Sequence, residues 1–158
     1  EEPSADRPLA DLESVSFAEW QERLEAMRGG IVVVDHWATW CLPCLERFPQ
    51  LVELHREYGP QDVTFVSLCL DDRDDAEAVA RAREFLAEQE ATFANFLMDE
   101  NLFEAFEMLD LLGLPVVDIY DASGTVRFHL TADDPNDQFT DEQVEEAIRT
   151  LLAEEAAV

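Results

Sequence analysis

Two cysteines separated by two residues stand at the junction of an expected strand and an expected helix. The segment 31–37 is apolar and rich in β-branched residues, which predicts a buried strand. From residue 45 to residue 54, apolar side chains recur at helical spacing, which predicts a helix. Cys41 and Cys44 therefore lie where the strand ends and the helix begins. This position restricts both how the chain folds around the two thiols and which reactions they can perform.

The first turn of a helix favours a negatively charged sulfur, because its backbone N–H groups are unpaired and the positive end of the helix dipole lies there. We therefore expect Cys41 to ionise readily, and a thiolate is the nucleophile in disulfide exchange. Cys44 lies one turn further along, close enough for the two sulfurs to form a small ring. Pro43 costs little between them, since it has no N–H to lose in a first helical turn.

The cysteine pair alone leaves two other interpretations open, a structural disulfide and half of a zinc site. Zinc sites also use two cysteines at this spacing. A zinc site with four ligands would need two more, and only Cys69 and three histidines remain. Three cysteines also do not form a disulfide framework. These counts favour one redox pair, with Cys69 as a buried, inert thiol in the strand expected at 63–70.

The run VDHWATWCLPC, from Val34 to Cys44, resembles the thioredoxin superfamily, and within it the TlpA/ResA branch of thiol–disulfide oxidoreductases. The resemblance covers roughly residues 15 to 152. Three further features agree with it: Asp35 six residues before Cys41, Pro49 five residues after Cys44, and Gly113-Leu114-Pro115 ahead of an apolar strand.

This resemblance implies an α/β thioredoxin fold, in which a central mixed β-sheet is flanked by helices. It also implies an inserted helix and strand between the second main strand and the loop that carries a cis-proline, here Pro115. The alternative for Pro115 is a trans proline that begins an edge strand. The implied function is dithiol–disulfide exchange with protein thiols, with Cys41 as the nucleophile and Cys44 as the resolving thiol. The implied partners are substrate proteins and a redox partner protein, with no bound cofactor besides this pair. The substrate-binding positions would be Trp40, Leu42, Pro43, Leu114 and Pro115.

Asp35 is an acidic residue in an otherwise apolar strand, where a bare carboxylate is costly unless it is paired or protonated. The resemblance implies a proton relay from Asp35 to Cys44, through water, with a raised carboxyl pKa. The alternative is a carboxylate that caps a local backbone group. Thioredoxins often place a lysine near this acid, but the chain contains no lysine, so the sequence leaves open what balances Asp35.

Several other reactive or aromatic side chains have simpler interpretations. His36 alternates with Asp35 along the strand, so it faces the other side of the sheet, and we expect a buried, hydrogen-bonded ring rather than a ligand. His55 is expected on a helix surface. Trp37 and Trp40 are expected to shield the active site, although a role in the core is open for Trp37.

Two rival functions remain beside disulfide exchange. A thiol peroxidase is disfavoured, because a peroxidatic cysteine normally follows a loop rich in proline and threonine, whereas here both cysteines share one turn. A metal-binding module, for example one that delivers copper, would need a histidine near the pair, and the sequence places none of the three there.

The charge of the chain is strongly acidic. Against 37 acidic residues there are ten basic ones, all arginine, which gives a formal net charge of −27. Such a surface repels nucleic acid and anionic membranes, so neither is an expected partner. A habitat of high salt, a basic partner, or neither could account for the excess of acid.

The 158 residues suit one domain, which we expect to be monomeric and to comprise residues 15–158, after a polar, acidic tail at 1–14. No apolar run is long enough to span a bilayer. Because members of the resembled family are commonly exported or tethered outside the cytoplasm, we expect an extracytoplasmic protein, and the start at Glu1 would fit the removal of a signal or anchor.

Local signals place the remaining elements. Capping boxes at 16–19 and 140–143 predict the starts of two helices. Asp75 or a neighbour is expected to cap a helix that runs to residue 90, and Asp99 or Asn101 to begin another. Strands are expected at 63–70, 93–98, 116–120 and 125–130, the last two joined by a turn at 121–124.

Overall fold

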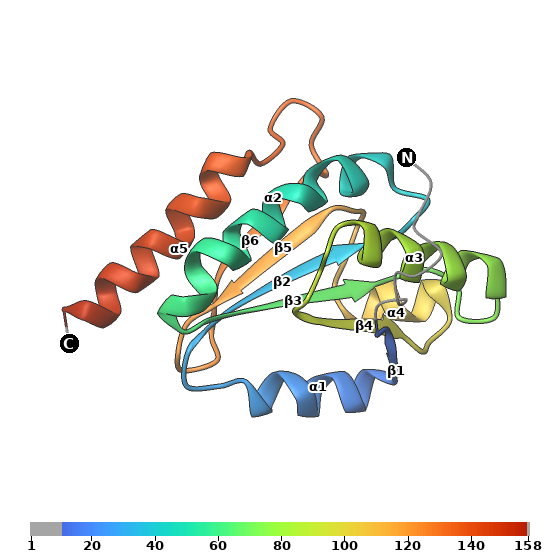
Figure 1. The fold of residues 1–158 in the computed structure, drawn as a ribbon, viewed down its shortest axis with the longest axis horizontal. Coiled ribbons are helices and arrows are strands. Elements are labelled where there is room, and N and C mark those ends of the chain that lie inside the picture. Colours follow the sequence, from blue (N-terminus) through green and yellow to red (C-terminus); the bar gives the residue numbers. More distant parts are fainter. Residues whose placement is uncertain (1–10, 158) are drawn as a thin grey trace.

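The computed structural model describes residues 11–157, which form a six-stranded mixed sheet with helices on both faces (Figure 1). The strand order is β1-β4-β3-β2-β5-β6. The strands are β1 (Glu13–Val15), β2 (Ile31–Trp37), β3 (Val63–Cys69), β4 (Ala94–Met98), β5 (Val116–Tyr120) and β6 (Val126–Thr131). The helices are α1 (Phe17–Ala26), α2 (Leu42–Tyr58), α3 (Ala76–Glu88), α4 (Leu102–Met108) and α5 (Asp141–Ala156), with a 3₁₀ turn, η1 (Gly59–Gln61).

The centre of the sheet is the parallel pair of β2 and β3, whose register aligns Asp35 with Ser67. On its other side β2 pairs with β5 in antiparallel orientation. All seven residues of β2 are buried, as expected of a strand with helices on both faces. The mixed sheet and its apolar central strands confirm the fold class predicted from the sequence.

Alternation along β2 sends its side chains into two separate hydrophobic cores. Val33 and Trp37 contribute to the core under α2, α3 and α5. Val32 and Val34 contribute to the core under α1 and α4. Since successive side chains of a strand point to opposite faces, Asp35 lies on the α2 side and His36 on the α1 side. This is the arrangement that the sequence predicted for the two residues.

The helix starts follow the predicted capping residues. Ser16 and Thr140 each form a complete capping box, with Glu19 and Gln143 respectively. Asp75 accepts a hydrogen bond from the Ala78 N–H at the start of α3. The side chain of Asn101 caps α4, which settles the choice between Asp99 and Asn101. The interval between β3 and the loop that contains Pro115 holds α3, β4 and α4, and so contains the predicted additional helix and strand.

The structure differs from the sequence prediction at the start of the domain. Residues 1–10 of the expected tail lie outside the described residues. Residues 13 and 14, assigned to that tail, instead belong to β1, which pairs in parallel with β4. Leu12 is also buried. A three-residue strand has too few positions to show an alternating pattern, and it forms here because the edge of β4 offers backbone groups to pair with.

Candidate active site

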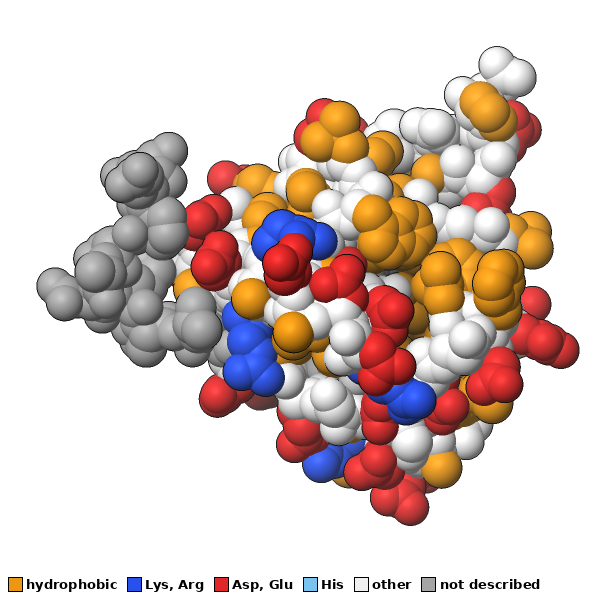
Figure 2. Space-filling view, turned by 90° about the vertical axis from the view of Figure 1, so that its right-hand side faces the viewer, with side chains coloured by type: hydrophobic (Ala, Val, Ile, Leu, Met, Phe, Trp, Pro, Cys, Tyr) orange, Lys and Arg blue, Asp and Glu red, His pale blue; other side chains and the backbone are white. Residues whose placement is uncertain are grey.

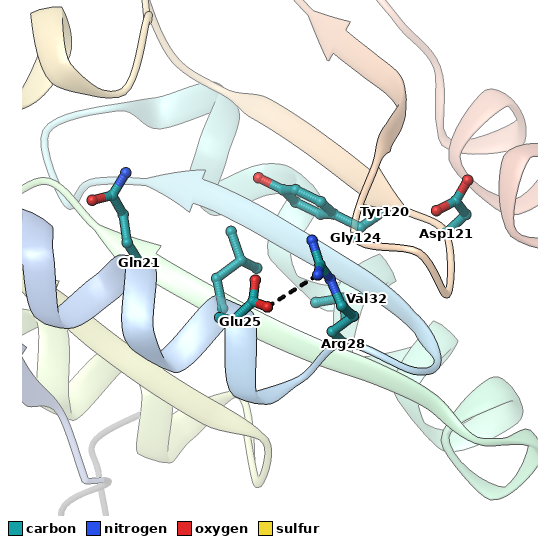
Figure 3. Close-up of a pocket in the computed structure, with 8 residues that line it drawn as sticks. Gln21, Glu25, Arg28, Val32, Tyr120, Asp121 and Gly124 are labelled. Carbon is teal, nitrogen blue, oxygen red and sulfur yellow. Dashed lines mark ion pairs between the residues drawn. The ribbon is translucent and has the colours of Figure 1, made fainter.

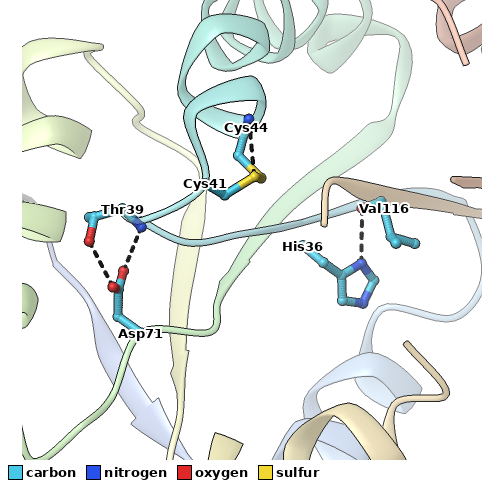
Figure 4. Close-up of a disulfide and its surroundings, with 6 residues drawn as sticks. All are labelled: His36, Thr39, Cys41, Cys44, Asp71 and Val116. Atoms are coloured by element: carbon cyan, nitrogen blue, oxygen red, sulfur yellow. Dashed lines mark hydrogen bonds between the residues drawn. A yellow bond between two sulfur atoms is a disulfide. The ribbon is translucent and has the colours of Figure 1, made fainter. Parts of the chain in front are cut away.

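The two cysteines lie at the end of the sheet where β2 and β3 terminate and α2 begins. Cys41 is the N-cap of α2 and has an extended backbone conformation, while Cys44 is the third residue of the helix. Their sulfurs form a disulfide, with 5.3 Å between the two Cα atoms (Figure 4). The sequence prediction that both thiols belong to the start of this helix is confirmed.

Backbone N–H groups of the first helical turn point at Cys41. The sulfur of Cys41 lies 3.3 Å from the backbone nitrogen of Cys44, which donates to it, and the carbonyl of Cys41 accepts from the N–H groups of Cys44 and Leu45. The exposed fraction is 6% for Cys41 and 1% for Cys44. Cys41 is therefore the more accessible residue of the pair, as expected, but in the disulfide form it is buried as well.

Apolar residues surround the disulfide at the surface. Trp40 and Leu42 are 56% and 64% exposed, and Pro43 is exposed too. Leu114 is half-buried and packs against the core that includes both cysteines, and the Leu114–Pro115 peptide bond is cis. Figure 2 shows the face of the molecule at this end of the sheet, where apolar side chains are interspersed with many acidic ones.

Asp35 is buried on the same face of the sheet as α2, with 3% of its surface exposed. Its Oδ1 has no hydrogen-bond partner within residues 11–157. Burial raises the pKa of Asp35 to about 7, against a smaller opposite effect of the positive charge of Arg47. A carboxyl group with a pKa near neutrality can both accept and release a proton at physiological pH.

In this chain without lysine, Arg47 is the positively charged residue that lowers the pKa of Asp35. Its guanidinium lies 4.2 Å from the centre of the Phe139 ring, and its Nε lies 3.4 Å from Oδ1 of Asp141. The sequence analysis did not single out this residue. Its position one turn after Cys44 on α2 was a usable signal, because residues three apart share a helix face.

Asp71 is a second residue that the sequence analysis did not single out. The structure buries its carboxylate, which accepts hydrogen bonds from the backbone N–H and the hydroxyl of Thr39, two residues before Cys41 (Figure 4). It also accepts a bond from the thiol of Cys69. Asp71 and Thr39 lie close together because β2 pairs with β3, and the sequence alone does not show which strands pair.

Cys69 and Trp37 are both fully buried. The pKa of the Cys69 thiol is raised well above its ordinary value, first by burial and then by the nearby charge of Asp71. The ring of Trp37 packs against Phe48 and Phe85 in the core. The inert role predicted for Cys69 agrees with this burial. For Trp37 the core interpretation holds, and of the two tryptophans only Trp40 is at the surface.

The three histidines contact carbonyl, carboxylate and aromatic groups. His36 is buried, and its Nδ1 lies 3.1 Å from the carbonyl oxygen of Val116, so the ring N–H donates there. Burial lowers the pKa of His36. His129 pairs with Asp118 on β5. The surface position predicted for His55 is correct only in part, because its ring is half-buried and packs edge-on against Phe65 and Phe93.

A hollow of about 210 Å³ lies on the opposite side of the sheet, between the end of α1 and the β5–β6 turn (Figure 3). Arg28 and Glu25, which line it, form an ion pair of 3.1 Å. Tyr120 also lines it, and burial together with the charge of Asp118 raises the pKa of Tyr120 to about 12. Within residues 11–157, no group of three or more His, Cys, Asp or Glu side chains is placed to hold a metal ion.

The structure combines the features of a thioredoxin-like protein on a mixed sheet. These are a cysteine pair at a helix start, a buried acid in the central strand, and a cis-proline loop before the neighbouring strand. Comparison with known proteins agrees with this class. The model of the AhpC/TSA family matches residues 7–129, and the chain belongs to this family.

Individual relatives are distant thiol–disulfide oxidoreductases. The thiol-disulfide oxidoreductase ResA of Oceanobacillus iheyensis is 37% identical over 49 residues, which are 31% of this chain and 26% of ResA. A Chlorobium tepidum crystal structure, described as a thiol:disulfide interchange protein DsbE, is 26% identical with a TM-score of 0.64, covering 82% of this chain and 84% of that one. A secreted disulfide oxidoreductase of Mycobacterium tuberculosis shares the fold, with 20% identity, a TM-score of 0.62, and 80% and 86% covered.

The matched segments are short relative to the curated relatives. The chain spans between about a quarter and about a half of their lengths. Among the helices that the structure describes, none combines the length and the apolar character required to cross a membrane.

Proposed function

We propose that the protein is a thiol–disulfide oxidoreductase that exchanges its Cys41–Cys44 pair with the thiols and disulfides of other proteins. The observation that carries this proposal is the placement of Cys41 at the N-cap of α2, with a backbone N–H donating to its sulfur. A donor in that position stabilises the thiolate of Cys41 when the disulfide is reduced. Cys41 is therefore the attacking thiol in the proposed mechanism.

In the reducing direction, the Cys41 thiolate attacks one sulfur of the substrate disulfide. A mixed disulfide forms, and the other substrate sulfur leaves as a thiolate that takes up a proton. Cys44 then loses its proton and attacks the sulfur of Cys41, which releases the second substrate sulfur and closes the Cys41–Cys44 bond. Two electrons and two protons pass to the substrate, and the reverse sequence oxidises a substrate dithiol.

Asp35 is the proposed base for the Cys44 proton. Its carboxyl group has a pKa near 7, so it can accept that proton at neutral pH and return it in the reverse direction. Asp35 and Cys44 belong to the α2 side of the sheet, and the unpartnered Oδ1 of Asp35 leaves an acceptor for a bridging water. The relay through water extends the proposal and rests on these two observations.

The surface around the disulfide is the proposed binding site for an extended substrate segment. The exposed side chains of Trp40, Leu42 and Pro43 supply apolar contacts on the helix side. Leu114 and Pro115 form the opposite side, where the backbone of Leu114 is proposed to pair with the substrate chain. Because one neighbour in fold is a secreted protein, we also propose an extracytoplasmic location, with a redox partner protein there.

The decisive experiment equilibrates the purified protein with glutathione buffers and then presents the reduced form with a protein disulfide such as that of insulin. We expect reversible formation of the Cys41–Cys44 bond and stoichiometric electron transfer to insulin, both abolished in Cys41→Ser. A pair that stays oxidised in strong reductant, or that does not reduce any protein disulfide, would contradict the proposal.

Two further measurements on the reduced protein test the rival functions. Rapid turnover of hydrogen peroxide would favour a peroxidase, and tight copper binding by the reduced pair would favour a metal-binding module.

A further inference from the structure

The loop before Cys41 is bonded to the end of β3 through the side chain of Asp71, beyond the last backbone hydrogen bond between β2 and β3. The N–H of Leu70 donates to the carbonyl of Trp37 at 2.7 Å, and this bond ends the ladder between the two central strands. From there one chain continues through residues 38–40 to Cys41, and the other continues to Asp71. With no further backbone pairing between them, the N–H of Thr39 needs another acceptor.

Asp71 supplies that acceptor with its side chain. One carboxylate oxygen lies 2.8 Å from the Thr39 nitrogen, and the other lies 2.7 Å from the Thr39 hydroxyl oxygen (Figure 4). The thiol of Cys69 donates to the same carboxylate at 3.1 Å. Asp71 is only 4% exposed, so these three donors replace the water that a carboxylate otherwise binds. Hydrogen bonds to a charged acceptor are about twice as strong as neutral ones.

The bonded residue is close to the nucleophile along the chain. Thr39 precedes Cys41 by two residues, and the N–H of Cys41 donates back to the carbonyl of Ala38 at 3.1 Å. The segment from Ala38 to Cys41 is therefore a single tight turn, held at its middle by Asp71. A turn held in this way has few alternative conformations, so the direction in which Cys41 enters α2 is restricted.

We propose that Asp71 is a positioning residue for the exchange reaction. By holding Thr39 it keeps the sulfur of Cys41 at the N-cap of α2, where the first-turn N–H groups stabilise the thiolate. The effect of Asp71 on exchange rests on the proposed function. Its effect on the reactivity of the Cys41 thiol does not. Asp71 touches neither the sulfur atoms of the pair nor, in the proposed mechanism, the substrate.

Position and charge have opposite effects on Cys41, which makes the proposal testable. A negative charge near a thiol disfavours the thiolate, so the charge of Asp71 by itself slows the reaction of Cys41 at neutral pH. The hydrogen bonds to Thr39 favour the thiolate, because they hold the sulfur of Cys41 at the helix start. Asp71→Asn removes the charge but keeps the shape, since its amide oxygen can accept from the Thr39 N–H and its amide nitrogen can donate to the Thr39 hydroxyl. Asp71→Ala removes both the charge and the bonds.

The experiment measures the alkylation rate of Cys41 in the reduced, full-length protein between pH 4 and pH 9, with the site of labelling identified by peptide mapping. We expect Asp71→Ala to slow alkylation at pH 7 by about 3- to 10-fold, as the thiol moves back toward the behaviour of free cysteine, whose pKa is about 8.5. We expect Asp71→Asn to react as fast as wild type or faster. Asp72→Asn, which removes one charge from an exposed neighbour, is the matched control.

A second pair of variants covers the case in which Asp71→Ala does not fold. Thr39→Val keeps the shape of Thr39 and its N–H bond but removes the hydroxyl donor, whereas Thr39→Ser restores that donor. We expect slower alkylation in Thr39→Val and recovery in Thr39→Ser, with a parallel shift in the reduction potential of the pair. Equal rates in both Thr39 variants, or equal acceleration in both Asp71 variants, would overturn the positioning role. Because alkylation needs no substrate protein, this result is independent of whether the exchange activity itself is found.

Discussion

The sulfur of Cys41 lies 3.3 Å from the backbone nitrogen of Cys44, so the residue proposed to resolve the mixed disulfide also donates a hydrogen bond to the attacking sulfur. The same helical turn therefore treats the two thiols differently. The sulfur of Cys41 accepts a backbone N–H at the helix start, while Cys44 lies inside the turn and is almost completely buried. Burial disfavours a thiolate and N–H donors favour it, which separates the roles of two chemically identical groups.

This asymmetry predicts the order in which the three cysteines react. In the reduced protein near pH 7, alkylation is expected to label Cys41 well before Cys44, and to leave Cys69 unlabelled in the folded state. Mass spectrometry of the peptides at successive times measures the order. Early labelling of Cys44 or Cys69 would show that the roles are wrongly assigned, and the denatured protein, in which all three should react alike, provides the control.

Substitution of either cysteine should separate the two steps of exchange. Cys44→Ser is expected to accumulate covalent adducts with substrate proteins, because nothing can displace the substrate from Cys41. Cys41→Ser is expected to form no adducts and to show no turnover. Non-reducing electrophoresis detects the adducts, and Cys69→Ser is the matched control, which should behave like wild type. Retained activity in Cys41→Ser would rule out Cys41 as the nucleophile.

The raised pKa of Asp35 predicts how stability depends on pH. Asp35 has a pKa of about 7 in the folded protein, above the ordinary carboxyl value, so the folded state keeps a proton that the unfolded chain releases. The stability from this protonation is present below about pH 4 and is lost as the pH rises toward 7. Asp35→Asn should therefore gain stability relative to wild type between pH 4 and pH 8, by on the order of 4 kcal/mol.

Denaturant unfolding of the oxidised proteins at each pH measures this difference. Glu46→Gln, at an exposed position on α2, is the control for the loss of a carboxylate from this part of the protein. A constant difference for Asp35→Asn would mean that Asp35 ionises with the same pKa in the folded and the unfolded protein. In the reduced protein, the same variant is expected to slow the exchange steps that move the proton of Cys44. Unchanged rates between pH 6 and pH 9 would remove Asp35 from the mechanism.

Arg47 is predicted to set how far the pKa of Asp35 rises. Its positive charge lowers that pKa, so Arg47→Met should raise it further and shift the pH range over which stability is lost to higher values. Arg47→Lys loses the planar stacking on Phe139 but keeps the positive charge. We therefore expect the pKa of Asp35 in this variant to stay close to its wild-type value. Arg56→Met, which removes an exposed ion pair with Glu90, is the control. A shift as large in the control would mean that total charge, and not Arg47, is responsible.

The acidic surface predicts that salt stabilises the fold. A net charge of −27 on 158 residues produces self-repulsion, and the screening length falls from about 30 Å at 0.01 M salt to about 3 Å at 1 M. The thermal midpoint should rise over this range of NaCl concentration. Glu22, Glu53 and Glu88 are exposed and form no ion pair within residues 11–157. Changing them to Gln should raise the midpoint at low salt and flatten its dependence on salt. A midpoint that is constant or falls in wild type would contradict the prediction.

Much of this architecture could be predicted because its signals are local. The apolar run of β2, the capping boxes at Ser16 and Thr140, and the turn before β6 each depend on residues that are neighbours in the chain. The cysteine pair could be placed for the same reason, since a strand end and a helix start are both visible in a short window. The differences occurred where a partner distant in sequence decides the outcome, as for β1, which forms only against β4, and for His55, whose ring packs against Phe65 and Phe93.

The linear order of residues was enough to assign Cys41 and Cys44 to one helical turn, Asp35 to the centre of a buried strand, and Asp35 and His36 to opposite faces. Each of these follows from the period of a helix or a strand, and so needs no knowledge of the rest of the molecule. Which groups control those residues was decided only by the packing. Arg47 affects Asp35, and Asp71 holds Thr39, because folding brings together side chains from α2, β2 and the end of β3. Electrostatic and hydrogen-bonding partners are chosen by distance in space, which the order of residues along the chain does not contain.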